Sequence, residues 1–187
     1  MPGVLLFLLS AAAALRSSNS VGTRCNYAAD NGVYLSTYGS LLQKNVVPKA
    51  AVTQLDRALS LPYVRGVAHY QNWSTLEVDD GIFNWTTIDA VFDVARKHRK
   101  YVILGLQQGV AAPYWLLNEA AARGIRTVDF VHRNPGWWHW STLHRYTDSG
   151  QQVITMAIPW DLRYEVYVKR AVTAMAARYA SRTTAYT

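Results

Sequence analysis

Strand-like segments alternate with helix-like segments between residues 32 and 107, and this order restricts the fold more than any other feature of the chain. The strand-like segments begin near residues 32, 64 and 101, so the two intervals are 32 and 37 residues long. Each interval has room for one helix that crosses back over the sheet to a parallel strand. The pattern predicts an α/β fold built on a parallel sheet.

The predicted strands are short and rich in β-branched and aromatic residues. They cover residues 32–37, Val64 to Tyr70 and Tyr101 to Leu106. The third is continuously apolar, which is typical of a strand buried on both faces. Residues 183–187 are rich in Thr and Tyr and predict the start of a fourth strand.

Apolar residues recur at helical spacing in three other segments. Helices are expected from Pro48, from Thr86 and from Asp161 to Ala180. Thr86 and Asp89 have the spacing of a capping box. The basic residues 96–100 close the second helix, where cations complement the helix dipole, and we favour this interpretation over a nucleic-acid patch.

The interval after the third strand is too long for a single βα unit. We expect a loop and hairpin insertion at about residues 110–158. Within it, residues 127–131 and 152–156 are expected to be strands, with turn residues at 148–150 near one end.

The first twenty residues predict a secretory signal peptide. An apolar run from Val4 to Leu15 is followed by Ser and Asn, and it is shorter than the roughly 20 residues that span a bilayer. No Lys or Arg precedes the run, so a disordered start or a membrane anchor are the alternatives. We expect a secreted protein with a mature part at 21–187 and no stable membrane span.

Composition and motifs exclude several classes of protein. A hydrophobic share of 50% with 17% charged residues excludes a disordered chain, and the single cysteine excludes a disulfide framework. The glycine-rich phosphate motifs and the hydrolase motif GxSxG are absent, and the five His residues lack metal-ligand spacing. We therefore expect no cofactor and no metal. The net charge of +7 comes from scattered Lys and Arg, so no nucleic-acid partner is expected.

Amides and tryptophans follow the second and third predicted strands. Gln71 and Trp73 follow the second, and Gln108 and Trp115 follow the third. Ligands of parallel α/β sheets bind at the carboxyl ends of strands. Amides hydrogen-bond hydroxyls and flat rings cover apolar faces, so these four residues are candidates for binding a carbohydrate substrate. The alternative interpretation is that each of the four side chains packs between helices and strands.

The same region resembles barrel glycoside hydrolases of the β-galactosidase and endoglycanase clan. In their second βα unit a Trp, a Leu-Glu pair and a Gly-x-Tyr/Phe-x-Trp motif precede a helix. The matching residues here are Val67, Trp73, Glu77, Gly81, Phe83, Trp85 and Asp89. Residues 102–115 and 158–179 resemble the third strand and third helix of those proteins, so the resemblance covers about residues 32–180.

This resemblance implies a (β/α)8 TIM barrel that hydrolyses O-glycosyl bonds through two carboxylates. In the clan the acid/base follows the fourth strand and the nucleophile follows the seventh, whereas this chain ends as the fourth begins. The resemblance therefore implies about the first three to four βα units, with neither catalytic carboxylate carried over and no activity of the chain as given. The alternative is a non-catalytic carbohydrate-binding fragment or remnant.

Glu77 is a weak catalytic candidate, because it is the only carboxylate near a strand exit with a motif around it. The resemblance implies instead that Glu77 ties down the loop before the helix. A partial barrel also leaves sheet edges unpaired, so self-association is expected.

Two N-glycosylation sequons begin at Asn72 and Asn84. Asn72 lies at the exit of the second predicted strand, where a glycan would obstruct a sugar site. We therefore expect Asn84 to be the modified residue.

Overall fold

The computed structural model describes residues 33–37, 48–132 and 143–180 of the 187-residue chain. These residues form a mixed α/β fold with a parallel sheet, as predicted from the sequence. The predicted signal peptide at 1–20 and the predicted strand at 183–187 lie outside the described residues, so both stay predictions.

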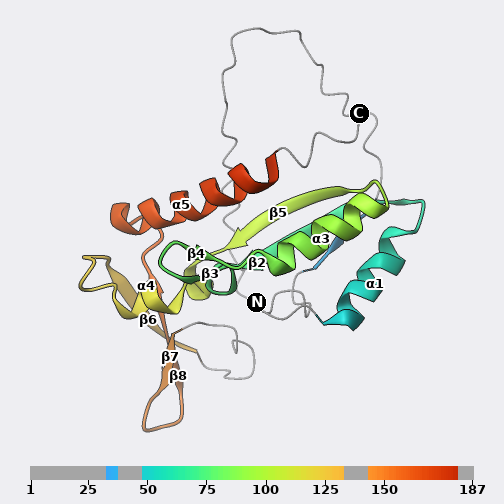
Figure 1. Cartoon of the computed structure of the whole chain (residues 1–187). Helices are drawn as coiled ribbons and strands as arrows, with labels where there is room; N and C mark the ends of the chain where they lie inside the picture. The colour runs from blue at the N-terminus through green and yellow to red at the C-terminus, as the bar shows by residue number, and fades with distance from the viewer. Residues whose placement is uncertain (1–32, 38–47, 133–142, 181–187) are drawn as a thin grey trace, which may run out of the picture. The chain divides into compact units, whose positions relative to one another are not determined.

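The parallel sheet contains β1 (Val33–Ser36), β2 (Val64–Asn72) and β5 (Tyr101–Gln107) in the order β1-β2-β5. Both strand pairs are parallel. Helices α1 (Lys49–Leu59) and α3 (Thr86–Lys97) make the two crossovers and lie side by side (Figure 1). The predicted strand–helix–strand–helix–strand order is confirmed.

Burial of one face of this sheet explains why these segments are stable together. The side chains of the two helices and of β2 form one apolar cluster, which excludes water from the helix-facing side of the sheet. Its buried members are Ala51, Leu55, Leu59, Val64, Val67, Val91, Val94 and Ala95.

The prediction that the third strand is buried on both faces is wrong for the described residues. Tyr101 and Ile103 of β5 are 49% and 51% exposed, whereas Val102, Leu104 and Leu106 pack against helices. β5 is an outer strand of the described sheet, and helices cover one of its faces. A continuous apolar run does not distinguish one-sided from two-sided burial. Self-association through the sheet edges stays a prediction.

The predicted capping box at the start of α3 does not form. Trp85 is the N-cap residue and its side chain makes no capping bond; the Thr86 amide donates instead to Asn84 Oδ1 at 3.1 Å. The Asp89 carboxylate accepts bonds from the Tyr179 hydroxyl at 2.9 Å and from Arg178 at 2.6 Å. These charged and hydroxyl donors are distant in the sequence, so local spacing did not reveal them.

The basic end of α3 has a structural role, as expected. Lys97 Nζ and His98 Nε2 each lie 2.8 Å from Asp56 Oδ1 of α1. Lys100 Nζ donates to the backbone oxygens of Leu61 and Val64. The basic run thus joins the end of α3 to α1 and to the start of β2.

Between β2 and α3 the chain forms a short helix, α2 (Trp73–Leu76), and a hairpin of β3 (Glu77–Asp79) and β4 (Ile82–Phe83). After β5 come the short helices η3 (Gly109–Ala111) and α4 (Tyr114–Asn118).

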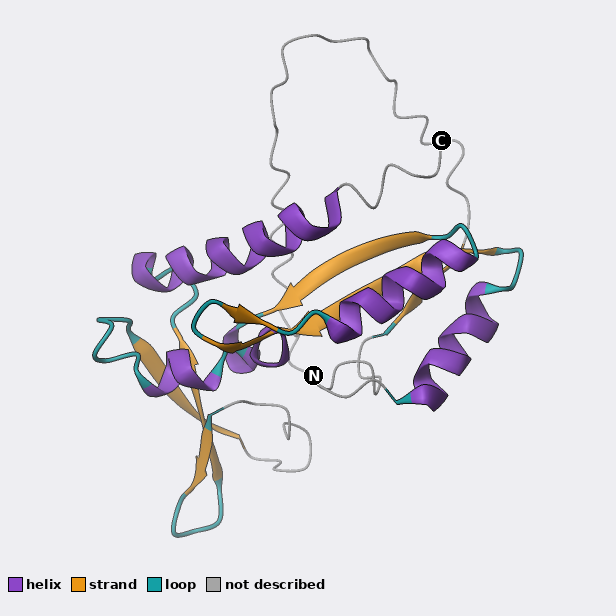
Figure 2. Ribbon diagram, in the orientation of Figure 1, coloured by secondary structure: helices purple, strands orange, loops and turns teal. Residues whose placement is uncertain are grey.

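The predicted hairpin region is a separate antiparallel sheet. It contains β6 (Thr127–His132), β7 (His144–Tyr146) and β8 (Gln152–Ala157) in the order β6-β8-β7 (Figure 2). The predicted pairing of residues 127–131 with 152–156 is confirmed.

The last described element is α5 (Leu162–Tyr179), which starts at the predicted place because Asp161 caps it. Asp161 Oδ1 accepts hydrogen bonds from the amides of Arg163 and Tyr164. α5 closes a second apolar cluster over α4 and β8, with buried members Trp73, Ala112, Leu116, Leu117, Ala120, Ile125, Ala157, Tyr164 and Ala171. Among the described residues, no helix is both long and apolar enough to cross a membrane.

Gly66 of β2 allows the close approach of its neighbour strand. A Cβ at this position would lie 2.4 Å from the backbone oxygen of Tyr101, whereas a Cβ at Gly105 would lie 2.8 Å from the ring of Tyr70. A backbone atom cannot move away as a ring can. We expect Gly66→Ala to lower the free energy of unfolding by about 3 kcal/mol and Gly105→Ala by about 1 kcal/mol, the range for overpacked cores. Urea denaturation measures both, and equal costs would contradict the strand spacing described here.

Candidate functional site

The carboxyl ends of the parallel strands form one edge of the sheet, where the sequence predicted a ligand site. Asn72 at the end of β2 pairs in register with Gln107 at the end of β5. Thr37 follows β1, and its amide donates to the Ala68 oxygen of β2 at 3.0 Å. Asn72 and Gln107 therefore mark this edge, whereas Thr37 lies beside the middle of β2.

Gln71 is enclosed in a buried chain of hydrogen bonds. Its Oε1 lies 3.0 Å from His69 Nε2, and its Nε2 donates to Thr75 Oγ1 at 2.5 Å. His69 Nδ1 lies 2.7 Å from Thr37 Oγ1, and Thr75 Oγ1 donates to the Asn72 oxygen at 2.9 Å. Gln71 is 1% exposed, so its side-chain amide bonds to His69 and Thr75 and is not accessible to a ligand.

Trp73 and Glu77 form a second buried pair. The indole Nε1 of Trp73 donates to Glu77 Oε2 at 2.7 Å, and both residues are fully buried. Glu77 Oε1 accepts the Gly81 amide at 2.9 Å and forms an ion pair with Arg170 of α5. The carboxylate thus closes the β3–β4 hairpin and attaches it to α5.

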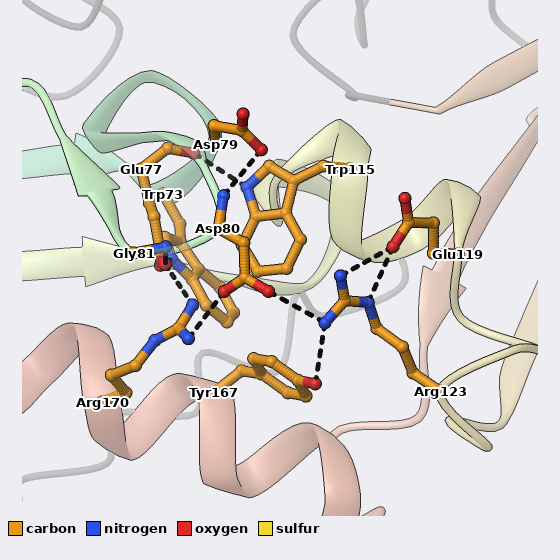
Figure 3. Close-up of polar contacts among 10 residues, drawn as sticks. All are labelled: Trp73, Glu77, Asp79, Asp80, Gly81, Trp115, Glu119, Arg123, Tyr167 and Arg170. Atoms are coloured by element: carbon orange, nitrogen blue, oxygen red, sulfur yellow. Dashed lines mark hydrogen bonds and ion pairs between the residues drawn. The ribbon is translucent and has the colours of Figure 1, made fainter.

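Two arginines and two rings surround this pair (Figure 3). The guanidinium carbons of Arg123 and Arg170 each lie 5.1–5.7 Å from the ring centroids of Trp115 and Tyr167. Asp80 bridges both cations, at 3.0 Å from Arg123 and 2.7 Å from Arg170. We call the group of Glu77, Asp80, Trp115, Arg123, Tyr167 and Arg170 the arginine clamp.

Charge pairing shifts the pKa values inside the arginine clamp. Burial alone would raise the pKa of Asp80, but Arg170 and Arg123 lower it below its usual range. Burial alone would lower the pKa of Arg170, but Asp80 and Glu77 raise it. Both shifts favour the charged forms, so Asp80 and Arg170 form an ion pair at neutral pH.

Glu77 is not placed to act on a substrate in this structure. A general acid or nucleophile must reach a substrate atom. Glu77 is 0% exposed, and both of its oxygens accept bonds from Trp73, Gly81 or Arg170. The geometry agrees with the role of loop anchor that the resemblance implies.

The structure corrects the expected binding role of the Gln71 and Trp73 side chains, because both are enclosed. Trp115 is half-buried between the two guanidinium groups, and its Nε1 donates to the Glu77 backbone oxygen at 3.2 Å. Gln108 is half-buried and directly follows β5. The four predicted binding residues therefore do not assemble into one wall, and Gln108 is the one placed at the sheet edge.

Sequence reasoning missed Arg123, Arg170 and His69 as members of these networks. Arg170 reaches Glu77 across 93 positions, and His69 reaches Thr37 across 32. Tyr167 and Arg170 lie three positions apart on α5, which places them on one helix face, but nothing local identified their partners. Asn72 was treated only as a sequon, yet its Oδ1 is buried and accepts no hydrogen bond.

No group of three or more His, Cys, Asp or Glu side chains in the described ranges is arranged to hold a metal ion. Comparisons of the chain with family models, with curated proteins and with solved structures found no match.

Removing the Glu77 carboxylate should destabilise the fold. Glu77→Ala removes the acceptor of the Trp73 indole and one of the two carboxylates paired with Arg170, so we expect the free energy of unfolding to fall by about 3 kcal/mol, as for other broken buried ion pairs. Glu119→Gln is the matched control: Glu119 also binds an arginine of the clamp, but its side chain is 51% exposed. Glu119→Gln should lower the free energy of unfolding by no more than about 0.5 kcal/mol. Urea denaturation followed by Trp fluorescence measures both, and similar costs would contradict the anchor role.

Proposed function

We propose that this chain is the N-terminal part of a secreted (β/α)8-barrel protein of the glycoside hydrolase type, and that its sheet edge forms part of a carbohydrate-binding wall. One observation carries the proposal. Two consecutive parallel βαβ units place Asn72 and Gln107 in register at the carboxyl ends of their strands, and the half-buried Gln108 follows directly. Barrel enzymes place their ligands at this end.

An amide side chain at this end of the strands suits a sugar because it carries both a donor and an acceptor for hydroxyl groups. Gln108 extends the row of amides beyond β5 and is half-buried. The arginine clamp supports the row indirectly, since it holds the β3–β4 hairpin that follows α2. In this proposal Gln108 contacts the sugar, while Trp73 and Glu77 position the loop.

The second candidate is a non-catalytic carbohydrate-binding protein. The engagement of both Glu77 oxygens favours it, because the carboxylate nearest the sheet edge is then unable to act as acid or nucleophile. Under either candidate, binding of sugar precedes any chemistry, so binding is the property to test first.

We expect the full chain to bind neutral oligosaccharides and Gln108→Ala to weaken that binding about fivefold, the effect of losing one hydrogen bond. The probes are cello-, xylo-, manno- and galacto-tetraose, titrated into 15N-labelled protein. The control is Gln151→Ala, an exposed glutamine at the turn between β7 and β8, which should leave the affinity unchanged.

One result would overturn the proposed sugar-binding wall, and another would overturn the anchor role of Glu77. Absence of shifts at the Asn72 and Gln108 side-chain amides with all four probes would exclude a wall at this edge. Hydrolysis of aryl glycosides by the chain, abolished by Glu77→Gln, would show that Glu77 is a catalyst and that the anchor role is wrong.

Secretion through a eukaryotic pathway should modify Asn84 and leave Asn72 largely bare. Asn72 is 7% exposed, whereas Asn84 is half-exposed and uses its Oδ1 for the Thr86 amide, so that Nδ2, the atom a glycan modifies, is outside that bond. Glycopeptide mass spectrometry of the secreted chain measures the occupancy of both. Heavy occupancy of Asn72 would mean that the end of β2 is open to solvent and is not a sugar site.

A further inference from the structure

His69 is a buried titratable residue that the proposed function does not use. It lies in the middle of β2 with an exposure of 0%, and it joins Thr37 on one side to Gln71 on the other. The bond with Thr37 links the β1 segment to β2 through side chains.

The donor and the acceptor of each hydrogen bond in the series Thr37–His69–Gln71–Thr75 can be assigned by starting from Thr75. Thr75 Oγ1 uses its hydrogen on the Asn72 oxygen, so it accepts from Gln71 Nε2. Gln71 Oε1 must then accept from His69 Nε2, because an amide oxygen has no hydrogen to give. His69 therefore carries its single proton on Nε2, and its Nδ1 accepts from the Thr37 hydroxyl.

A second proton on His69 conflicts with this arrangement. It would turn Nδ1 into a donor facing the hydroxyl that donates to it, so Thr37 would have to reverse its bond. It would also place a full charge where the contacts of the imidazole are a hydroxyl and an amide, both neutral.

The charged groups on the elements packed around β2 do not offset that charge. Asp56 of α1 is paired with Lys97 and His98, Asp89 of α3 with Arg178, Asp93 with Arg96, and Glu77 with Arg170. The remaining titratable or charged side chains on these elements are Lys49, Arg57, Tyr34, Tyr70, Arg65 and Tyr101. Burial lowers the pKa of His69, and only the bond to Gln71 opposes that effect.

We propose that His69 is an acid-sensitive latch, which holds β1 on the sheet at neutral pH and releases it when the surroundings become acidic. β1 contains four residues and is an outer strand of the described sheet, and of its side chains Leu35 packs against the helix-covered core, so opening β1 removes only this one side chain from the core cluster. Once open, His69 is exposed to water and can take the proton that the closed form excludes.

The size of the effect follows from linkage. An exposed imidazole has a pKa of about 6.5, and burial lowers the pKa of His69 in the closed form, so opening becomes more favourable as the pH falls below 6.5. Above it the latch keeps its full strength. Between pH 7.5 and 5.5 the opening constant of β1 should rise about tenfold.

Amide hydrogen exchange on the full chain tests this. The probe is the Thr37 amide, which donates to Ala68, and the reference is the Ala171 amide in α5. After correction for the intrinsic pH dependence of exchange, the Thr37 opening constant should rise about tenfold from pH 7.5 to 5.5, while the Ala171 constant stays level. His69→Gln should abolish the rise. His98→Gln, which alters the partly exposed histidine bound to Asp56, should retain it.

The imidazole itself gives a measurement that needs no variant. Its 15N shifts in the folded wild type should show the Nε2–H tautomer and no titration down to pH 5.5. A level Thr37 constant, an equal rise in His69→Gln, or a His69 that titrates near pH 6.5 in the closed form would each overturn the latch.

Discussion

The buried carboxylate of Glu77 is the contact on which the arrangement of the second half of the described chain depends. It accepts from the Trp73 indole beside β2, from the Gly81 amide in the hairpin and from Arg170 on α5. A carboxylate removed from water is stable only when each oxygen has a donor, so the three segments must meet at this point. The fixed position of the hairpin, and with it the entry to α3, follows from that requirement.

The arginine clamp extends the same constraint to the surface. Arg123 and Arg170 share Asp80 and lie over the same two rings, Trp115 and Tyr167. Planar cations that contact both rings and carboxylates are held more tightly than flexible ammonium groups. This cluster therefore links α4 to α5 and to the β3–β4 hairpin. The Trp115 ring packs against Arg123 and Arg170 in this cluster, so it does not present an open surface to a sugar.

Two buried hydrogen-bond networks hold different segments of the fold together. The chain from Thr37 through His69 and Gln71 to Thr75 holds β1 and β2 together, and the Glu77 network holds the segments that follow them. The first consists of neutral groups and is sensitive to protonation of its histidine. The second includes the ion pair of Asp80 and Arg170, in which each partner shifts the pKa of the other toward the charged form. Acid should therefore loosen β1 and leave the hairpin and α5 in place.

The sequence by itself determined the order of strands and helices, the parallel pairing and the antiparallel insertion. These features follow from periodicity, from loop length and from Asp161 as a cap, which are all local. The tertiary structure decided which polar residues are buried. Gln71, Trp73 and Glu77 stand where a ligand site is expected, but their side chains bond to His69, Thr75 and Arg170 instead. Partners that lie far apart in the chain, such as Glu77 and Arg170, leave no periodic signal, because only the folded chain brings them into hydrogen-bonding distance. The same holds for β5, whose apolar run predicts burial, while the helices that cover one face and the outer position of the strand decide how much of it is exposed.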